Sequence, residues 1–137
     1  MPQYWILKTE PSEFSFDDLQ RAGRTRWDGV SNALALKHLR AMRPGDQALI
    51  YHTGDEKRMV GTATVAGEPY PDPSDDRLTV VDLTSGPALP EPVTLATVKA
   101  DPEFKDLALV RMSRLSVVPV PPPLWKRLLK MAGAGAG

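Results

Sequence analysis

Proline and glycine interrupt this sequence so often that only short helices and strands fit between them. The 137 residues include 14 prolines and 10 glycines. Proline has no backbone N–H and ends a helix, and glycine favours turns. Segments therefore close at Pro11, at Gly23, at the pair Pro44-Gly45 and before the run Pro121-Pro122-Pro123. We expect a succession of brief elements joined by turns.

Between these interruptions, residue patterns predict about five short strands and several helices. Apolar and β-branched runs predict strands over 4–8, 47–52, 59–65, 78–83 and 114–120. Capping residues and amphipathic spacing predict helices over 16–22, from 33 to the stop at Pro44, over 94–99 and over 124–130. Residues 24–31, 70–76 and 86–92 are predicted to be loops. This order is typical of an α+β domain built round a curved, mostly antiparallel sheet or barrel.

Composition is that of an ordinary folded domain. Hydrophobic residues make up 42% of the chain and charged residues 25%, which is close to the average for globular proteins and far from the disordered class. The chain has no cysteine, and this excludes a disulfide scaffold, a thiolate metal site and a thiol nucleophile. We expect one domain over 1–131 and a frayed Ala/Gly tail over 132–137.

Charge argues against a protein that holds nucleic acid by bulk attraction alone. Lysine and arginine number 17, and so do aspartate and glutamate. Residues 1–45 and 91–137 are nonetheless basic, whereas 46–90 are acidic. The N-terminus lacks the pattern of a signal peptide, and no apolar run approaches the length of a membrane helix. We therefore expect a cytoplasmic protein, or a nuclear one if its source has a nucleus, without a membrane partner.

The sequence contains few recognisable catalytic or metal-binding motifs. The two histidines, His38 and His52, lie 14 positions apart, and no metal-binding, phosphate-loop or nucleophile motif accompanies them. We expect no metal and no cofactor. His38 lies among basic residues on a predicted helix, which favours a solvated side chain. His52 ends a predicted strand at the mouth of the sheet, where structural and binding roles both stay open.

Two polar features suit ligand recognition. Lys8, Thr9 and Glu10 place a cation, a hydroxyl and a carboxylate where the first strand becomes a loop, although a pair of charges that only fixes the strand exit explains them equally well. Trp27 lies in a predicted polar loop, where an exposed indole would suit stacking with a nucleobase. Core packing would also explain it. Trp5 and Trp125 lie in apolar surroundings and are predicted to be core residues.

A longer series of motifs, in order from residue 4 to about 130, resembles the EVE domain family of the PUA-like superfamily. The resemblance implies a PUA-like pseudo-barrel of about five or six mostly antiparallel strands with peripheral helices. The motifs that carry it are Tyr4-Trp5-Ile6-Leu7-Lys8-Thr9-Glu10-Pro11-Ser12, Phe16-Asp17-Asp18-Leu19, Trp27-Asp28-Gly29-Val30, Asn32, Leu39-Arg40-Ala41-Met42, Gly45-Asp46, Tyr51-His52-Thr53-Gly54, Val60-Gly61, Tyr70-Pro71-Asp72-Pro73 and Arg114-Leu115-Ser116-Val117.

This resemblance implies a non-catalytic module that binds nucleic acid and reads a modified base in an aromatic pocket. The implied base is 5-methylcytosine or one of its oxidised forms in DNA, or a modified base in RNA, and it must leave its stack to be inspected. By this match the base pocket comprises Trp27 as the stacking plate, Asn32, Lys8, Thr9 and Glu10 as edge or backbone readers, Tyr51, His52 and Thr53 as the opposite wall, and Ser113 from the last strand. The predicted phosphate contacts are Arg24, Arg26, Lys37 and Arg114.

Two other functions stay open. Enzymes of the related ASCH group use a lysine, a threonine and a glutamate to hydrolyse an acylated nucleoside, and Lys8-Thr9-Glu10 supplies those residue types. Adjacent strand residues point to opposite faces, so these three converge only where the chain bends. The other alternative is a small-molecule-binding module, which the neutral net charge favours.

This chain departs from the family pattern at two positions after the Trp27-Asp28-Gly29 motif. Family members often carry an arginine and a tyrosine at the positions of Ser31 and Ala33.

Overall fold

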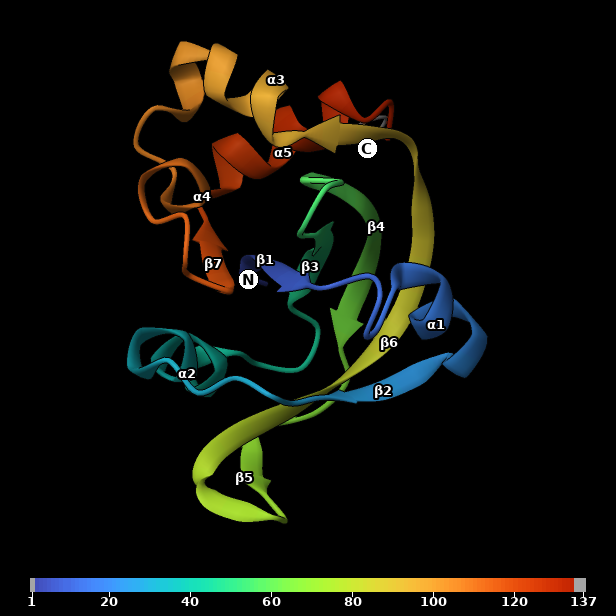
Figure 1. Cartoon of the computed structure of the whole chain (residues 1–137), viewed down its shortest axis with the longest axis vertical. Helices are drawn as coiled ribbons and strands as arrows, with labels where there is room; N and C mark the ends of the chain where they lie inside the picture. The colour runs from blue at the N-terminus through green and yellow to red at the C-terminus, as the bar shows by residue number, and fades with distance from the viewer. Residues whose placement is uncertain (1, 135–137) are drawn as a thin grey trace.

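A computed structural model describes residues 2–134 of the chain, and its centre is one curved sheet (Figure 1). The strand order is β2-β6-β4-β3-β1-β7, and β5 pairs with β6 beside this path. β1 (Tyr4–Thr9) runs parallel to β3 (Gln47–His52) and antiparallel to β7 (Val117–Val120). The remaining pairings are antiparallel. The sheet is mostly antiparallel as predicted, with seven strands, and it stays open because β2 and β7 end the order.

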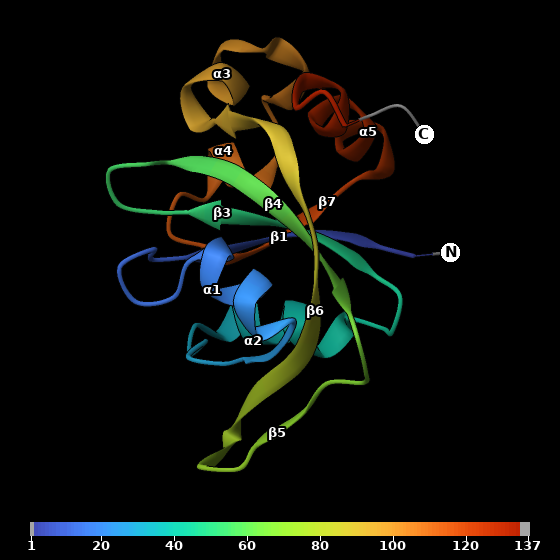
Figure 2. The same ribbon diagram turned by 90° about the vertical axis from the view of Figure 1, so that its right-hand side faces the viewer.

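Helices cover both sides of the central strands. In Figure 2, α1 and α2 lie on one side of β1, β3 and β4, and α3, α4 and α5 lie on the other. The remaining strands are β2 (Arg24–Trp27), β4 (Arg58–Val65), β5 (Tyr70–Asp72) and β6 (Asp75–Thr94). The helices are α1 (Phe16–Ala22), α2 (Ala33–Ala41), α3 (Leu95–Ala100), α4 (Ala108–Arg111) and α5 (Pro122–Met131), with a 3-10 turn η1 (Pro102–Phe104).

Most predicted elements are confirmed, and their caps explain why. Ser15 accepts a hydrogen bond from the Asp18 backbone N–H, and the Asp18 carboxylate accepts one from the Ser15 N–H, which is the predicted capping box. Trp5 and Trp125 are buried core residues as expected. The closing strand begins at Val117 rather than 114. Of the predicted frayed tail 132–137, Ala132 is instead buried, and its carbonyl accepts from the Glu91 N–H at 3.0 Å, whereas residues 135–137 lie outside the described residues.

Each of the three predicted loops contains strand residues: the predictions were wrong over 24–27, 70–72, 75–76 and 86–92, whereas 28–31 and the turn at 73–74 lie outside the strands as predicted. Residues 24–27 form β2, whose exposed arginines hide the strand pattern. Residues 70–76 form the β5–β6 hairpin, whose turn is held by the Asp72 carboxylate accepting from the Ser74 N–H and hydroxyl. Residues 86–92 belong to β6, and their prolines fit because the register with β4 shifts there.

One buried carboxylate ties the start of β1 to the start of β3. Asp46 is 2% exposed. It accepts hydrogen bonds from the Gln3 N–H, the Trp5 indole N–H and the Arg43 N–H. A buried carboxylate is tolerated when its lone pairs are satisfied in this way. These three hydrogen bonds hold the N-terminal end of β1 in place beside β3. They therefore also help to set where the C-terminal end of β1 leaves the sheet.

Candidate functional site

A cavity lined by charged, polar and aromatic residues lies where β1 and β2 end. We call it the base cavity, after the predicted base-binding residues Lys8, Thr9, Glu10 and Trp27 that line it; its volume is about 440 Å³. Three stretches of chain form most of its wall: the end of β1 with the following loop, the end of β2 with the following turn, and the residue before β7. Its lining residues are Lys8, Thr9, Glu10, Glu13, Phe14, Thr25, Arg26, Trp27, Asp28, Gly29, Val30 and Ser116.

The wall that follows β1 is a tightly bonded turn. The Glu10 carbonyl accepts from the backbone N–H groups of Glu13 and Phe14, both at 2.9 Å. The Thr9 hydroxyl donates to the Phe14 carbonyl at 2.7 Å. The chain bends here, so Lys8, Thr9 and Glu10 all line one cavity. The convergence that strand alternation alone disfavours is therefore present.

Trp27 is a floor of the cavity rather than an exposed plate. It is the last residue of β2, is 6% exposed and belongs to the hydrophobic core. Phe14 packs edge-on against it, with ring centroids 6.2 Å apart. Gly29 has φ of +76°, which allows the Asp28-Gly29 turn to leave the strand. Buried Val30 follows this turn and also lines the cavity. Trp27, predicted as a stacking plate, thus lines the cavity as a buried ring, and Phe14, which the sequence did not single out, lies against it.

Lys8 connects the cavity to a turn far away in the sequence. Its ammonium donates to the Ser113 carbonyl at 3.0 Å and lies 5.6 Å from the centre of the Tyr51 ring. The side chain is half-buried, and burial lowers the pKa of Lys8 from its usual value. This places one oriented cationic donor at the base cavity.

Glu10 is held in place by residues on its own loop and on β3's exit. Its carboxylate accepts from the Ser12 N–H, the Ser12 hydroxyl and the Thr53 hydroxyl, each at 3.3 Å. Gly54 lies against it, because a Cβ there would be 2.9 Å from Glu10 Oε2. Thr53, predicted as an opposite wall, therefore supports Glu10 from behind.

The other two residues of that predicted wall are structural. Tyr51 is buried, and burial raises the pKa of its hydroxyl. His52 is also buried; its Nε2 accepts from the Phe16 N–H at 3.0 Å, and its Nδ1 lies 2.9 Å from a Glu56 oxygen. Both ring nitrogens are thus occupied, and neither residue lines the base cavity. In this fold the His52 ring therefore holds the start of α1 through the Phe16 N–H, which is the structural role that the sequence left open beside binding.

Asn32, Ser113 and Arg114 line a neighbouring hollow instead. This flank cavity has a volume of about 390 Å³ and is lined by Asn32, Leu34, Arg111, Met112, Ser113, Arg114 and Leu115. The Asn32 side chain caps α2 by accepting from the Ala35 N–H. Ser113 and Arg114 lie in the turn before β7, not on the strand as predicted.

The predicted phosphate contacts are spread over several surfaces. Arg26 is exposed at the rim of the base cavity, where the Tyr70 hydroxyl and then Asp72 and Asp28 raise its pKa. Arg24 pairs with Asp82 at 3.0 Å. Lys37 is exposed on α2 and lines neither cavity. His38 on the same helix is half-buried, with its ring 5.9 Å from that of Trp5, so the side chain predicted to be solvated is only partly exposed.

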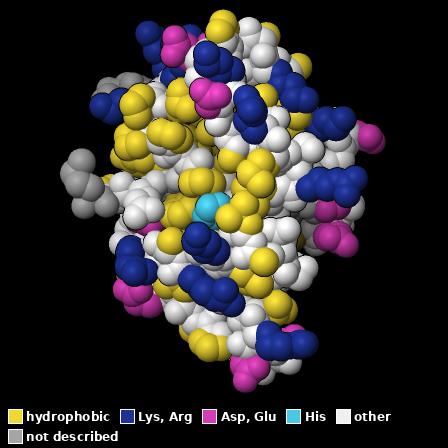
Figure 3. Space-filling model, turned by 90° about the vertical axis from the view of Figure 1, so that its left-hand side faces the viewer, with side chains coloured by type: hydrophobic (Ala, Val, Ile, Leu, Met, Phe, Trp, Pro, Cys, Tyr) yellow, Lys and Arg dark blue, Asp and Glu magenta, His cyan; other side chains and the backbone are white. Residues whose placement is uncertain are grey.

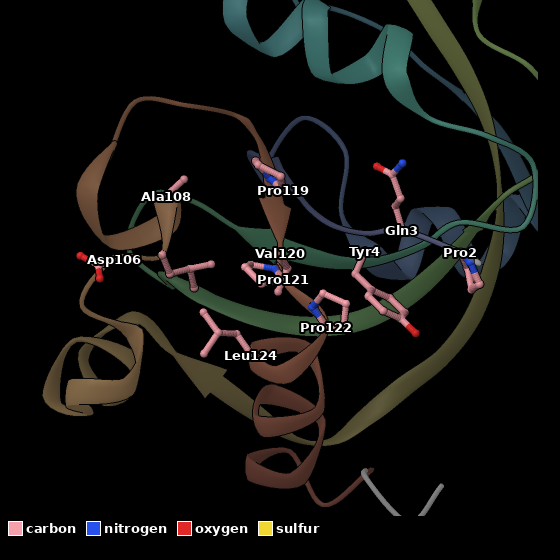
Figure 4. Close-up of a pocket in the computed structure, with 11 residues that line it drawn as sticks. Pro2, Gln3, Tyr4, Asp106, Ala108, Pro119, Val120, Pro121, Pro122 and Leu124 are labelled. Carbon is pink, nitrogen blue, oxygen red and sulfur yellow. The ribbon is translucent and has the colours of Figure 1, made fainter.

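A third cavity is apolar. It holds about 480 Å³ between the start of β1, β7 and α5, and Figure 4 shows Tyr4, Val120 and Leu124 among its walls. Figure 3 shows the hydrophobic side chains that gather on this face. Asp106 is its one ionisable lining side chain apart from the phenol of Tyr4. Such a surface offers little for a base edge or a phosphate, so the base cavity is the stronger candidate for polar recognition.

Neither a metal-binding cluster nor a membrane-spanning helix is found in the described part of the chain. Residues 2–134 contain no group of three or more histidines and acids placed to hold a metal ion. None of the helices described there combines the length and apolar character needed to cross a membrane.

Comparison with known proteins is consistent across sequence and structure. A Rhodopseudomonas palustris protein solved by NMR is 44% identical with a TM-score of 0.91, over 96% of this chain and 93% of that one. Human THYN1, solved in complex with 5-methylcytosine-containing DNA, is 24% identical with a TM-score of 0.88, over 95% and 97%. At that identity the second likeness shows the fold.

Curated relatives are longer than the region they share with this chain. Thymocyte nuclear protein 1 of Rattus norvegicus is 37% identical over 84 residues, which cover 53% of this chain and 37% of the relative. The sequence profile of the EVE domain matches residues 3–131. With nearly the whole described fold inside that match, the chain belongs to the EVE domain family.

Proposed function

We propose that this chain is a non-catalytic module that binds DNA and takes an extruded 5-methylcytosine into the base cavity. The observation that carries the proposal is the mixture of groups in that cavity: aromatic rings at Trp27 and Phe14, the cation of Lys8, and the carboxylates of Glu10 and Asp28. The DNA complex of the human relative, which shares this fold, supports DNA as the partner.

The groups match the chemistry of a cytosine edge. The exocyclic amine of cytosine donates hydrogen bonds, and aspartate or glutamate is the usual protein acceptor for it. Asp28 is exposed at the cavity, and Glu10 is held there by Ser12 and Thr53. Lys8 supplies a donor for the carbonyl oxygen O2 or the ring nitrogen N3 of the base. Phe14 and Val30 supply apolar surface for a 5-methyl group.

The charges at the rim suit a strand that enters the cavity. An extruded base brings its own phosphates to the mouth of the pocket. Arg26 is the exposed cation among the lining residues there. Since the chain has equal numbers of basic and acidic residues, these local contacts carry the electrostatic part of the affinity.

The state of Thr9 favours binding over hydrolysis. In an ASCH-like enzyme the threonine hydroxyl would need a base that takes its proton. Here that hydroxyl donates to the Phe14 carbonyl at 2.7 Å, and the Glu10 carboxylate accepts from Ser12 and Thr53 instead. The trio therefore holds the cavity wall together. A hydrolase acting on a modified nucleoside is the weaker alternative.

The first experiment is a titration with short oligonucleotides that differ by one methyl group. Fluorescein-labelled DNA carrying cytosine or 5-methylcytosine at one central position is titrated as single strand and duplex, at several salt concentrations. We expect tighter binding of the methylated strand. Equal affinity for both strands would contradict base reading, and binding that does not change with salt would favour the small-molecule alternative.

Asp28→Asn tests the edge reader without disturbing the core. Asp28 is exposed and lines the cavity, and the amide keeps its size. We expect the variant to lose about tenfold in affinity for the methylated strand, because one base-edge contact contributes about 1–3 kcal/mol. Asp17→Asn is the matched control, since Asp17 is exposed on α1 outside the lining. Equal losses in both variants would remove Asp28 from the site.

A further inference from the structure

Met112 is the exception to an otherwise buried apolar set. Among residues 2–134 it is the one large hydrophobic side chain in the exposed class, with 44% of its surface accessible. It begins a turn, residues 112–115, in which the Leu115 N–H donates to the Met112 carbonyl at 3.0 Å. The turn lies between α4 and β7.

Two arginines flank this methionine. Arg111 and Arg114 are both exposed, and with Met112 they line the flank cavity. Arg111 lies 3.6 Å from Asp106, but both side chains are mostly exposed, so that pair is weak. An apolar side chain between two cations is complementary to a polyanion that also has stacked rings, because the cations can bind its charges and the apolar side chain can contact its rings. Nucleic acid has that combination of features.

The flank cavity and the base cavity adjoin each other along two stretches of the chain. Val30 lines the base cavity and Asn32 the flank cavity, so at most about 7 Å of chain separates those walls. Ser116 and Leu115 are consecutive and line one cavity each. Lys8 of the base cavity donates directly to the Ser113 carbonyl in the turn. The turn 112–115 is therefore held against the base cavity by a direct contact.

We propose that the turn 112–115 enters the DNA base stack beside the extruded nucleotide, with Met112 filling the gap and Arg114 binding an adjoining phosphate. The inference rests on the proposed function, because it needs a base in the base cavity. It adds a second subsite for the flanking nucleotides.

The insertion of Met112 into the base stack, which we call the wedge, has a physical rationale. Extruding a base leaves a gap in the duplex, and if the neighbouring bases closed that gap the extruded base could not remain in the protein. Proteins that kink DNA insert apolar side chains, methionine included, between base steps. A thioether is flexible and polarisable, so it fits between bases of any identity. A single strand has no gap of this kind. The wedge therefore acts on duplex binding and leaves single-strand binding unchanged.

The test compares three variants on two forms of the same DNA. Met112→Ala, Met112→Leu and Lys126→Ala are titrated with a duplex and with a single strand, each carrying one 5-methylcytosine. Lys126 is exposed on α5 and serves as the control. We expect Met112→Ala to weaken duplex binding about tenfold and single-strand binding by less than about twofold. Met112→Leu keeps the apolar volume and restores most of the duplex affinity.

The outcomes separate this inference from the proposed function. If the wild-type chain binds neither DNA form, the proposed function fails, and the wedge falls with it. If the wild type binds both forms and Met112→Ala changes them equally, the wedge alone is refuted. Since Met112 is exposed, its variants keep the wild-type Tm, and a drop in Tm would show a packing role that overturns the inference.

Discussion

Replacing Trp27 by alanine tests whether the aromatic floor belongs to the core. The indole is 6% exposed, packs against Phe14 and lies in the same hydrophobic cluster as the strands of the sheet. Alanine at this position removes a large ring from a packed site. The surrounding β2–β6 pairing, in which Trp27 faces Val81, limits how far the strand can move to close the hole.

The expected loss lies at the lower end of the range for a buried tryptophan. Such replacements cost about 3–5 kcal/mol, and the adjoining base cavity lets water enter part of the space left at Trp27. We therefore expect about 3 kcal/mol. With about 2.1 cal/mol/K of unfolding entropy per residue over 137 residues, that loss lowers Tm by about 10 °C. Trp27→Phe keeps a ring and should lose about 1 kcal/mol.

Thermal and urea unfolding of the wild type and the two variants measure this directly. The urea concentration at the unfolding midpoint should be highest for the wild type, lower for Trp27→Phe and lowest for Trp27→Ala, with similar dependence of the unfolding free energy on urea in all three. A Tm drop under about 3 °C for Trp27→Ala would refute the packing argument. Trp27 would then be the exposed loop residue that its polar neighbours in the sequence suggest. Binding by Trp27→Ala is interpretable only at temperatures where the variant is folded.

Three further changes probe other parts of the structure. Gly61→Ala should destabilise by about 1–3 kcal/mol, because its Cβ would lie 2.2 Å from the Phe16 ring, whereas Gly67→Ala meets nothing within 4 Å and should be nearly neutral in urea unfolding. The Tyr70 hydroxyl and Arg24 lower the pKa of Asp82 in the folded chain. Ionised Asp82 therefore stabilises the fold above its unfolded pKa of about 4, and this stabilisation is lost as pH falls through the lowered folded pKa. Tyr70→Phe should be less stable than the wild type at pH 7, and the difference in Tm should shrink at pH 2. Arg26→Ala should weaken binding to methylated and unmethylated DNA alike and reduce the salt slope by about 0.9, whereas Arg77→Ala on the β5–β6 hairpin should not.

Local signals in the sequence predicted the elements that rely on local physics. The capping box of Ser15 and Asp18 and the stop at Pro44 act within a few residues, so α1 and α2 follow from spacing alone. The mixed polar cluster Lys8-Thr9-Glu10 was identified in the same way. β2 was missed because four residues with two exposed arginines form a strand only when β6 pairs with them.

The rest of the site depends on contacts between residues far apart in the sequence. Lys8 meets Ser113 because β7 pairs with β1, and no local signal links positions 105 residues apart. The role of Thr53 depends on the Glu10 carboxylate, which reaches it across the exits of two parallel strands. His52 shows the same dependence, since its place at a strand end left both structural and binding roles open, and only the fold brings the Phe16 N–H to its Nε2.

The neutral net charge and the mixed cavity are consistent with one strategy for selecting a rare base. A strongly basic protein binds any DNA through many phosphates, and that non-specific affinity competes with recognition of the modified base. With 17 basic and 17 acidic residues, this chain has little long-range attraction for DNA. For the reader that we propose, affinity then comes from base-cavity contacts and from a few cations at its edge, such as Arg26 and Arg114. A shallow salt dependence combined with a strong dependence on the methyl group is the expected signature of that balance.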